Sequence, residues 1–150
     1  LIDMRKNRLE MGLSLGCDAV IDLSTEDLVE RANEMTNGAM FDAIIEATGH
    51  TKAVENITKM TAPGSRVVLL GLCGGRKACL DVDHIVTHDV EMYGSLASPG
   101  VWADVIQLME SGKLRTKDLI THRFALSEIE SAFKIMEDKD PSIVKIILEL

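Results

Sequence analysis

The sequence predicts an α/β fold built on a doubly wound parallel sheet. Short apolar runs alternate with amphipathic stretches along the chain, which is the pattern of strands flanked by helices. Residues 66–72 (RVVLLGL) contain four consecutive large aliphatic side chains, typical of a central parallel strand covered on both faces. With 46% hydrophobic and 27% charged residues, the 150-residue chain can bury a substantial core.

The first third of the chain predicts two strands, at 1–3 and 18–22, and two helices, over Lys6–Leu15 and from Leu28 onward. Gly16 is a typical C-cap residue and is expected to end the first helix. Ser24, with Asp27 three residues later, is expected to cap the second. Leu28, Ala32 and Met35 give this second helix one apolar face, and it should end before Gly38.

The middle of the chain predicts strands at 41–47, 66–72 and 90–96. Between the first two, a helix presents Ala53, Val54, Ile57 and Met60 on one side. Pro63-Gly64 is expected to close this helix. Gly71, Gly74 and Gly75 then open a loop, and the stretch from there to residue 89 is only weakly patterned.

A change of pattern at Lys113 predicts two parts, residues 1–112 and 113–150. Before it, Pro99-Gly100 lead to a helix whose Trp102, Val105, Ile106 and Met109 are expected to lie against the sheet. After it comes a polar connector that includes 121–124. A helix with a Ser127–Glu130 capping box and a final strand at 143–148 complete the chain.

Charge and composition exclude several classes of function. The net charge of −8 and pI near 4.9 would repel nucleic acid and anionic membrane surfaces. No apolar run approaches the roughly 20 residues that span a bilayer, and no signal peptide is apparent. Cys17, Cys73 and Cys79 are expected to be free thiols. The cytoplasm is the expected location.

Asp3 is the first candidate binding residue. An acidic side chain at the carboxyl end of a strand lies where doubly wound folds bind their ligands. There it can accept hydrogen bonds from both ribose hydroxyls of an adenosine, and its charge would repel the 2′-phosphate of NADP. NAD is therefore favoured, although Arg5 and Lys6 keep NADP open. A helix-capping role for Asp3 is equally compatible with the sequence.

An ordered set of motifs extends this observation along the whole chain. The set comprises Asp3, Arg8-Leu9, 15–22 (LGCDAVID), 46–49 (EATG), 64–71 (GSRVVLLG), Gly94-Ser95, 111–113 (SGK), 120–126 (ITHRFAL), Ala132-Phe133 and Lys145-Ile146. In type and order these motifs resemble the C-terminal part of medium-chain zinc-dependent alcohol dehydrogenases, particularly those similar to sorbitol and threonine dehydrogenases. The resemblance implies a Rossmann-type cofactor domain at 1–112 and, at 113–150, a segment that returns to the catalytic domain.

The resemblance also implies roles for individual residues. Asp3 would bind the adenosine ribose, and Arg8 would lie along the adenosine. Leu70, Gly71 and Leu72 match the backbone that passes the nicotinamide ribose, where the absence of a Cβ at Gly71 permits close approach. Ser95 and Leu96 match the segment that lines the nicotinamide, and Lys145 matches a basic position that reaches the pyrophosphate in some members.

Two parts of the family's machinery have no counterpart here. The Gly-x-Gly-x-x-Gly turn that binds pyrophosphate follows the first strand of the family, and neither the turn nor the strand is present. The loop 71–75 (GLCGG) has the wrong glycine spacing for that role. No catalytic residue or zinc ligand can be assigned. We therefore expect the chain to be an excerpt of a longer protein. The excerpt would lack the first strand, be inactive alone and be loosely folded or rearranged.

Other metal sites are poorly supported by spacing. His84 and His88 are four residues apart, but no Glu occupies the HExxH position, so two surface histidines are the better interpretation. Cys73 and Cys79 are six residues apart, too far for a zinc knuckle. His50 is interpreted as a loop residue and His122 as part of the connector.

The function implied by the resemblance is reversible oxidation of an alcohol or polyol with NAD, with catalytic zinc held by the part of the full-length protein that is absent here. Two alternatives stay open: a zinc-free quinone-type reductase of the same superfamily, and a non-catalytic dinucleotide-sensing module. A homo-oligomer formed through the edge strand Val90–Leu96 is the expected assembly.

Overall fold

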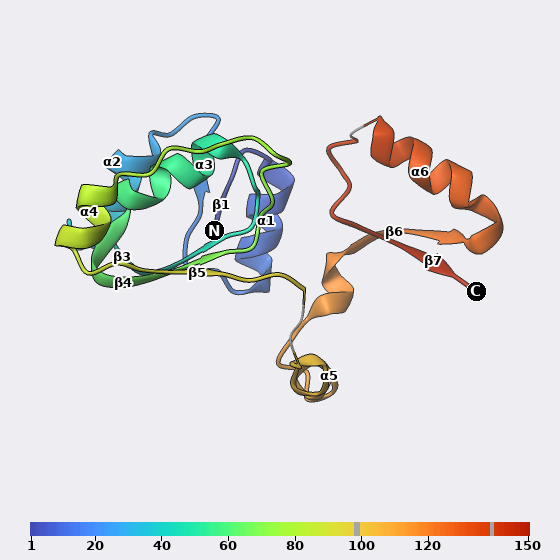
Figure 1. The fold of residues 1–150 in the computed structure, drawn as a ribbon. Coiled ribbons are helices and arrows are strands. Elements are labelled where there is room, and N and C mark those ends of the chain that lie inside the picture. The colour runs from blue at the N-terminus through green and yellow to red at the C-terminus, as the bar shows by residue number, and fades with distance from the viewer. Residues whose placement is uncertain (98–99, 139) are drawn as a thin grey trace. The chain divides into compact units, whose positions relative to one another are not determined.

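The computed structural model describes residues 1–97, 100–138 and 140–150 (Figure 1). By its internal contacts it divides into two compact units. One unit comprises residues 27–99. The other comprises residues 1–26 together with 100–150. All strand pairs in both units are parallel. Pro99, expected in the turn before the helix at Trp102, lies outside the described residues.

A three-stranded parallel sheet forms the centre of unit 27–99. Its strands are β3 (Phe41–Glu46), β4 (Thr61–Leu69) and β5 (Glu91–Gly94), in the order β3-β4-β5. Helices α3 (Thr51–Asn56) and α4 (Val82–Thr87) cover one face, where Val54, Ile57, Val67 and Val90 form the buried core. Because the strands are parallel, their carboxyl ends meet at one edge, where such sheets bind ligands.

The structure corrects the predicted cap of the helix that begins at Leu28 and the extent of the helix that follows it. Helix α2 (Leu28–Thr36) is capped by Asp27, whose carboxylate accepts hydrogen bonds from the N–H groups of Val29 and Glu30. The predicted cap, Ser24, is wrong: its hydroxyl and its N–H donate to Asp22, and these bonds lower the pKa of that carboxyl. A 3₁₀ turn, η1 (Ile57–Lys59), continues α3, and α4 forms within the weakly patterned stretch.

Strand β4 also runs differently from the prediction. It begins at Thr61, so Pro63-Gly64 lies inside the strand instead of closing the helix, and the N–H of Gly64 donates to the His88 carbonyl at 2.7 Å. The strand ends at Leu69, three residues before the predicted end at Leu72. Residues 70–72 therefore form a loop beyond the end of the strand.

The second unit contains two pairs of parallel strands. Strands β1 (Ile2–Asp3) and β2 (Ile21–Asp22) pair beside α1 (Lys6–Leu15), as predicted. Gly16 ends α1 in the left-handed region (φ 107°), where a glycine is least strained. The remaining elements are α5 (Trp102–Glu110), η2 (Thr116–Leu119), β6 (Ile120–Ala125), η3 (Leu126–Glu128), α6 (Ile129–Glu137) and β7 (Lys145–Glu149).

The C-terminal part corrects two expectations. The predicted connector at 121–124 is strand β6, which pairs with β7, so the last strand has a sheet partner in this chain. Thr121 strengthens the pair, since its hydroxyl donates to the Lys145 carbonyl and accepts from the Val144 N–H. The Ser127–Glu130 capping box is also wrong, because Glu128 accepts the hydrogen bond from the Ala125 N–H.

The apolar face of α5 is exposed. No residue of this helix is buried, and 66% of the Trp102 surface is accessible. The predicted apolar face, Trp102, Val105, Ile106 and Met109, is therefore not buried within its own unit.

The strand pairing agrees with the predicted fold class. Within the described residues, β1 pairs only with β2, and β3 pairs only with β4 and not with β1. In the doubly wound order the absent first strand would separate β1 from β3. The chain thus has the predicted α/β architecture without that strand.

Candidate functional site

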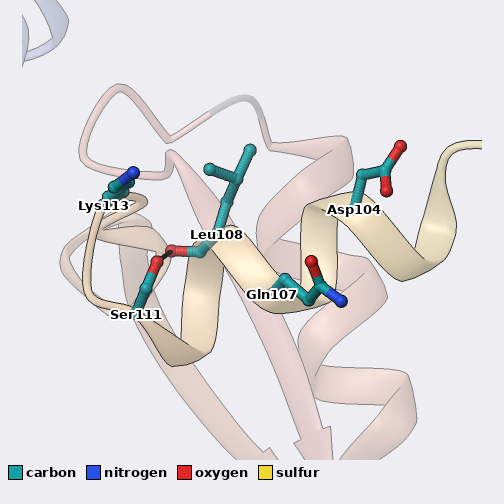
Figure 2. Close-up of a pocket in the computed structure, with 5 residues that line it drawn as sticks. All are labelled: Asp104, Gln107, Leu108, Ser111 and Lys113. Carbon is teal, nitrogen blue, oxygen red and sulfur yellow. Dashed lines mark hydrogen bonds between the residues drawn. The ribbon is translucent and has the colours of Figure 1, made fainter.

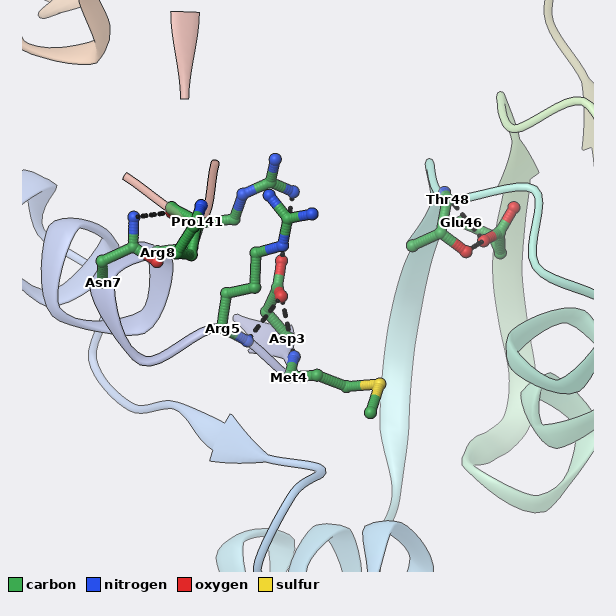
Figure 3. Close-up of polar contacts among 8 residues, drawn as sticks. All are labelled: Asp3, Met4, Arg5, Asn7, Arg8, Glu46, Thr48 and Pro141. Atoms are coloured by element: carbon green, nitrogen blue, oxygen red, sulfur yellow. Dashed lines mark hydrogen bonds and ion pairs between the residues drawn. The ribbon is translucent and has the colours of Figure 1, made fainter. Parts of the chain in front are cut away.

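Asp3 and Arg8 form a first group of predicted cofactor residues, at the carboxyl end of β1. Asp3 Oδ1 accepts hydrogen bonds from the N–H groups of Met4 (2.7 Å) and Arg5 (2.9 Å) (Figure 3). Its Oδ2 lies 3.6 Å from Arg8 Nη1, an ion pair between two partly exposed side chains. The two residues predicted to bind adenosine are therefore in contact.

This geometry also addresses whether Asp3 only caps the helix. The N-cap residue of α1 is Arg5, and no side chain bonds to the helix N-terminus at that position. Oδ1 of Asp3 fixes the turn before the helix, whereas Oδ2 makes only the longer ion pair. Arg8 Nε is buried and has no acceptor among the described residues. Asp3 Oδ2 thus remains as an acceptor for a ligand that carries hydroxyl groups.

A second group of predicted cofactor residues lies at the carboxyl edge of the three-stranded sheet. Leu70, Gly71 and Leu72 form the loop after β4, with both leucine side chains exposed. Ser95 follows β5, and its N–H donates to the Leu69 carbonyl at 3.0 Å. This bond brings together the two segments predicted to line the nicotinamide half of the cofactor. Leu96 is 72% exposed beside them.

Glu46 connects the loops after β3 and β4. It is the last residue of β3, only 4% of its surface is accessible, and its own carbonyl accepts from the N–H groups of Leu70 (2.7 Å) and Gly71 (3.1 Å). Its Oε1 accepts from the Thr48 N–H (2.8 Å), the Thr48 hydroxyl (2.5 Å) and the Gly49 N–H (3.1 Å). Figure 3 shows the carboxylate turned toward Thr48.

Two glycines allow these loops to interlock. A Cβ on Gly71 would overlap the Gly49 backbone and lie 2.6 Å from Glu46 Oε2. A Cβ on Gly49, which has φ +64°, would overlap the backbone of Leu72. Each loop therefore occupies the space that a side chain on the other would need.

Lys145 is the remaining predicted residue. It begins strand β7 and its side chain is exposed. Its backbone joins the Thr121 network, with the N–H 3.3 Å from the Thr121 hydroxyl. No contact with Asp3 or Arg8 is present among the described residues.

Two surface depressions lie beside α5, and none of the predicted cofactor residues lines either of them. The first, of about 400 Å³, is lined by Asp104, Gln107, Leu108, Ser111 and Lys113 (Figure 2). The Ser111 hydroxyl donates to the Leu108 carbonyl, as the helix end requires. The second, of about 690 Å³, adjoins residues 109–120. Neither contains a group of convergent polar side chains with an assignable chemistry.

His84 and His88 have structural partners. Their rings stack with centroids 3.9 Å apart, and His84 Nε2 lies 2.9 Å from the Thr61 hydroxyl. That hydroxyl donates its proton to the Thr58 carbonyl, so we assign the Nε2 proton to His84 as donor. His88 Nδ1 lies near the His84 carbonyl and the Thr87 hydroxyl. The ring stacking and the engaged nitrogens disfavour a shared metal.

The other potential metal ligands of the described residues are also dispersed. Across residues 1–97, 100–138 and 140–150, no three His, Cys, Asp or Glu side chains form a group that could hold a metal ion. The three cysteines are free thiols, as predicted. No helix in these ranges is both long and apolar enough to cross a bilayer.

Sequence reasoning missed the role of Glu46, although 46–49 (EATG) belongs to the motif set. A carboxylate at the end of a strand was a usable signal, because a buried charge requires several donors. The donors themselves, backbone N–H groups of the next turn, cannot be identified from residue types.

Comparison with known proteins places these features in a family. A profile of the zinc-binding dehydrogenase family matches residues 1–111. The chain is 33% identical over 143 residues to L-threonine 3-dehydrogenase of Bacillus licheniformis, covering 90% of this chain and 40% of that protein. It is 29% identical over 145 residues to D-arabitol-phosphate dehydrogenase of Enterococcus avium, covering 95% and 40%.

Solved structures agree on the fold. A structure of an Escherichia coli CFT073 alcohol dehydrogenase complexed with NADH matches with a TM-score of 0.91 at 23% identity, covering 99% of this chain and 43% of that one. The Thermus sp. ATN1 alcohol dehydrogenase matches with a TM-score of 0.87 at 26% identity, covering 98% and 42%. The predicted Rossmann-type architecture is confirmed.

The chain spans about 40% of the length of the relatives it matches. Within that span the family match includes both groups of predicted cofactor residues, from Asp3 to Leu96. We conclude that the chain belongs to the zinc-binding dehydrogenase family.

Proposed function

We propose that this chain is the cofactor-binding portion of an oxidoreductase that transfers hydride between an alcohol or polyol and NAD. The observation that carries the proposal is the family match over residues 1–111, which includes every proposed cofactor residue except Lys145. Relatives named threonine, arabitol-phosphate and erythritol/threitol dehydrogenases support a small hydroxylated substrate.

The chain's own residues would hold the cofactor at two places. The Asp3 carboxylate would accept hydrogen bonds from the adenosine ribose, with Arg8 along the adenosine. Asp3 would also repel a 2′-phosphate, which favours NAD over NADP. The backbone of Leu70, Gly71 and Leu72 would pass the nicotinamide ribose. Bound NAD supplies the hydride acceptor in this chemistry.

Ser95 and Leu96 would line the nicotinamide, and the exposed Leu96 side chain would exclude water from that side of the ring. Lys145 would place its ammonium group near the pyrophosphate. The NADH-bound structure of the Escherichia coli relative supports the choice of cofactor.

The zinc of the family does not fit the residues of this chain. The described part contains no group of three potential ligands, so no catalytic step is assigned to a metal here. We propose that the metal is held by the part of the full-length protein that lies outside the chain. We likewise propose a boundary at residue 112, beyond which 113–150 returns to the catalytic domain, and the end of the family match at 111 supports it.

A homo-oligomer formed through the 90–96 strand is part of the proposal. Among the described strands, β5 pairs only with β4, which leaves its other edge open. Tyr93 is 50% exposed, and its hydroxyl donates to Glu91 at 2.7 Å, which together with the Glu91 charge raises the pKa of Tyr93. An open, partly apolar edge strand is suited to pairing with a second copy.

The test is to measure bound zinc and NAD reduction by the full-length protein with L-threonine, sugar alcohols, butanediol and simple alcohols. We expect stoichiometric zinc, and turnover that is lost on chelation and restored by zinc. Oxidation of NADH or NADPH by a quinone, with no bound zinc and no turnover of the alcohols, would indicate a quinone-type reductase instead. Dinucleotide binding without turnover would indicate a sensor.

A further inference from the structure

We infer that Glu46 is a positioning residue that holds the 70–72 loop in place for the nicotinamide half of the cofactor. The inference rests on the proposed function. It starts from the burial of this carboxylate, which makes no ion pair among the described residues and is surrounded by hydrogen-bond donors instead.

The donors all come from the turn after β3. The Thr48 N–H, the Thr48 hydroxyl and the Gly49 N–H converge on Oε1, and the Gly49 N–H also lies 3.2 Å from Oε2. A buried carboxylate that accepts several hydrogen bonds fixes the chain that supplies them. The carboxylate thereby sets the position of the Gly49 backbone.

Gly49 in turn sets the position of the second loop. Its Cα faces the backbone of Leu72 so closely that no Cβ fits, and Gly71 lies against Gly49 and Glu46 Oε2 in the same way. The Glu46 carbonyl also accepts from the N–H groups of Leu70 and Gly71. One residue therefore controls the 70–72 loop through its backbone and through its side chain.

The matched substitution Glu46→Gln tests the side-chain route. Gln can keep one oxygen toward Thr48, but its NH₂ group then replaces Oε2 beside Gly71 and faces the Gly49 N–H, donor against donor. The expected consequence is a displaced 70–72 loop with the rest of the sheet retained.

The experiment measures binding of NADH and of ADP to the full-length protein by calorimetry. ADP carries the adenosine and both phosphates but lacks the nicotinamide ribose and ring. We expect Glu46→Gln to weaken NADH about tenfold, the size of one lost buried hydrogen bond, and to change ADP by less than about twofold. Glu30→Gln, an exposed change of the same type on α2, should alter neither.

Two further variants keep the test decisive if Glu46→Gln does not fold. Thr48→Val removes one donor to the carboxylate and should weaken NADH selectively, whereas Thr48→Ser keeps the hydroxyl and should bind NADH like the wild type. Equal losses of NADH and ADP, or no loss, in a folded variant would overturn the role of Glu46. Failure of the wild type to bind NADH would instead overturn the proposed function, and this inference with it.

Discussion

At the scale of single residues, Asp3 is the residue on which the proposed choice of NAD over NADP depends most. The structure gives its two oxygens different tasks: Oδ1 fixes the turn before α1, and Oδ2 pairs with Arg8 at 3.6 Å. A substitution that keeps Oδ1 and removes the charge therefore separates local structure from cofactor choice.

Asp3→Asn is that substitution. The amide oxygen can still accept from Met4 and Arg5, while the negative charge that would oppose a 2′-phosphate is gone. We expect the ratio of NADPH to NADH affinity to rise by about tenfold or more, since like charges in contact are strongly disfavoured. Calorimetry on the full-length protein measures the ratio.

Asp18→Asn provides the control, because it removes an exposed carboxylate from the same unit without touching Asp3. Its affinity ratio should stay at the wild-type value. If Asp3→Asn left the ratio unchanged as well, Asp3 would have only its turn-forming role.

The resemblance placed Asp3 and Arg8 along the same adenosine, but it did not predict that the two side chains contact each other. The same reasoning could not find the Glu46 network. Its donors are backbone N–H groups that become available only when the turn at Thr48-Gly49 folds back on the strand.

At the scale of elements, long apolar periodicity was a better guide than short polar signals. Helix α1 has its predicted bounds because Gly16 ends it unambiguously. Strand β6 was missed because polar Thr, His and Arg precede Phe124, and its stabilising partner β7 lies more than twenty positions later. Ser24 was predicted to cap α2, but Asp27 caps it, and residue type alone does not favour Asp over Ser at a cap.

The cap of α2 gives a stability prediction. Asp27→Ala removes the acceptor for the Val29 and Glu30 N–H groups and should lower the free energy of unfolding by about 1 kcal/mol. Urea denaturation of the full-length protein provides the measurement, with Asp27→Asn as a variant that retains an acceptor. Ser24→Ala should lower the free energy of unfolding by only a few tenths of a kcal/mol, since the Ser24 hydrogen bonds go to Asp22 and not to the helix. A larger loss of stability for Ser24→Ala than for Asp27→Ala would show that Ser24 is the cap, as predicted from the sequence.

At the scale of the whole molecule, the open edge of β5 and the exposed face of α5 are two surfaces that lack a partner among the described residues. The chain covers about 40% of its relatives' length, and we propose that the rest of the protein covers α5. For β5 we propose a second copy. Ser95 donates to Leu69, so the alternation of a parallel strand directs the Gly94 N–H to the open edge.

Gly94→Pro tests the β5 interface. The proline removes the outward N–H, and the surroundings of Gly94 leave room for new atoms, with nothing within 4 Å of a Cβ placed there. We expect the molar mass of the full-length protein in light scattering to fall to that of a smaller species. Gly94→Ala keeps the N–H and should keep the assembly. An unchanged mass for the proline variant would exclude pairing at this edge.

The most direct test of the central claim is calorimetric titration of the wild-type full-length protein with NADH and with NADPH. The account predicts saturable binding of NADH, with NADPH at least about tenfold weaker because of Asp3. Tighter binding of NADPH, or no binding of either dinucleotide, would contradict it.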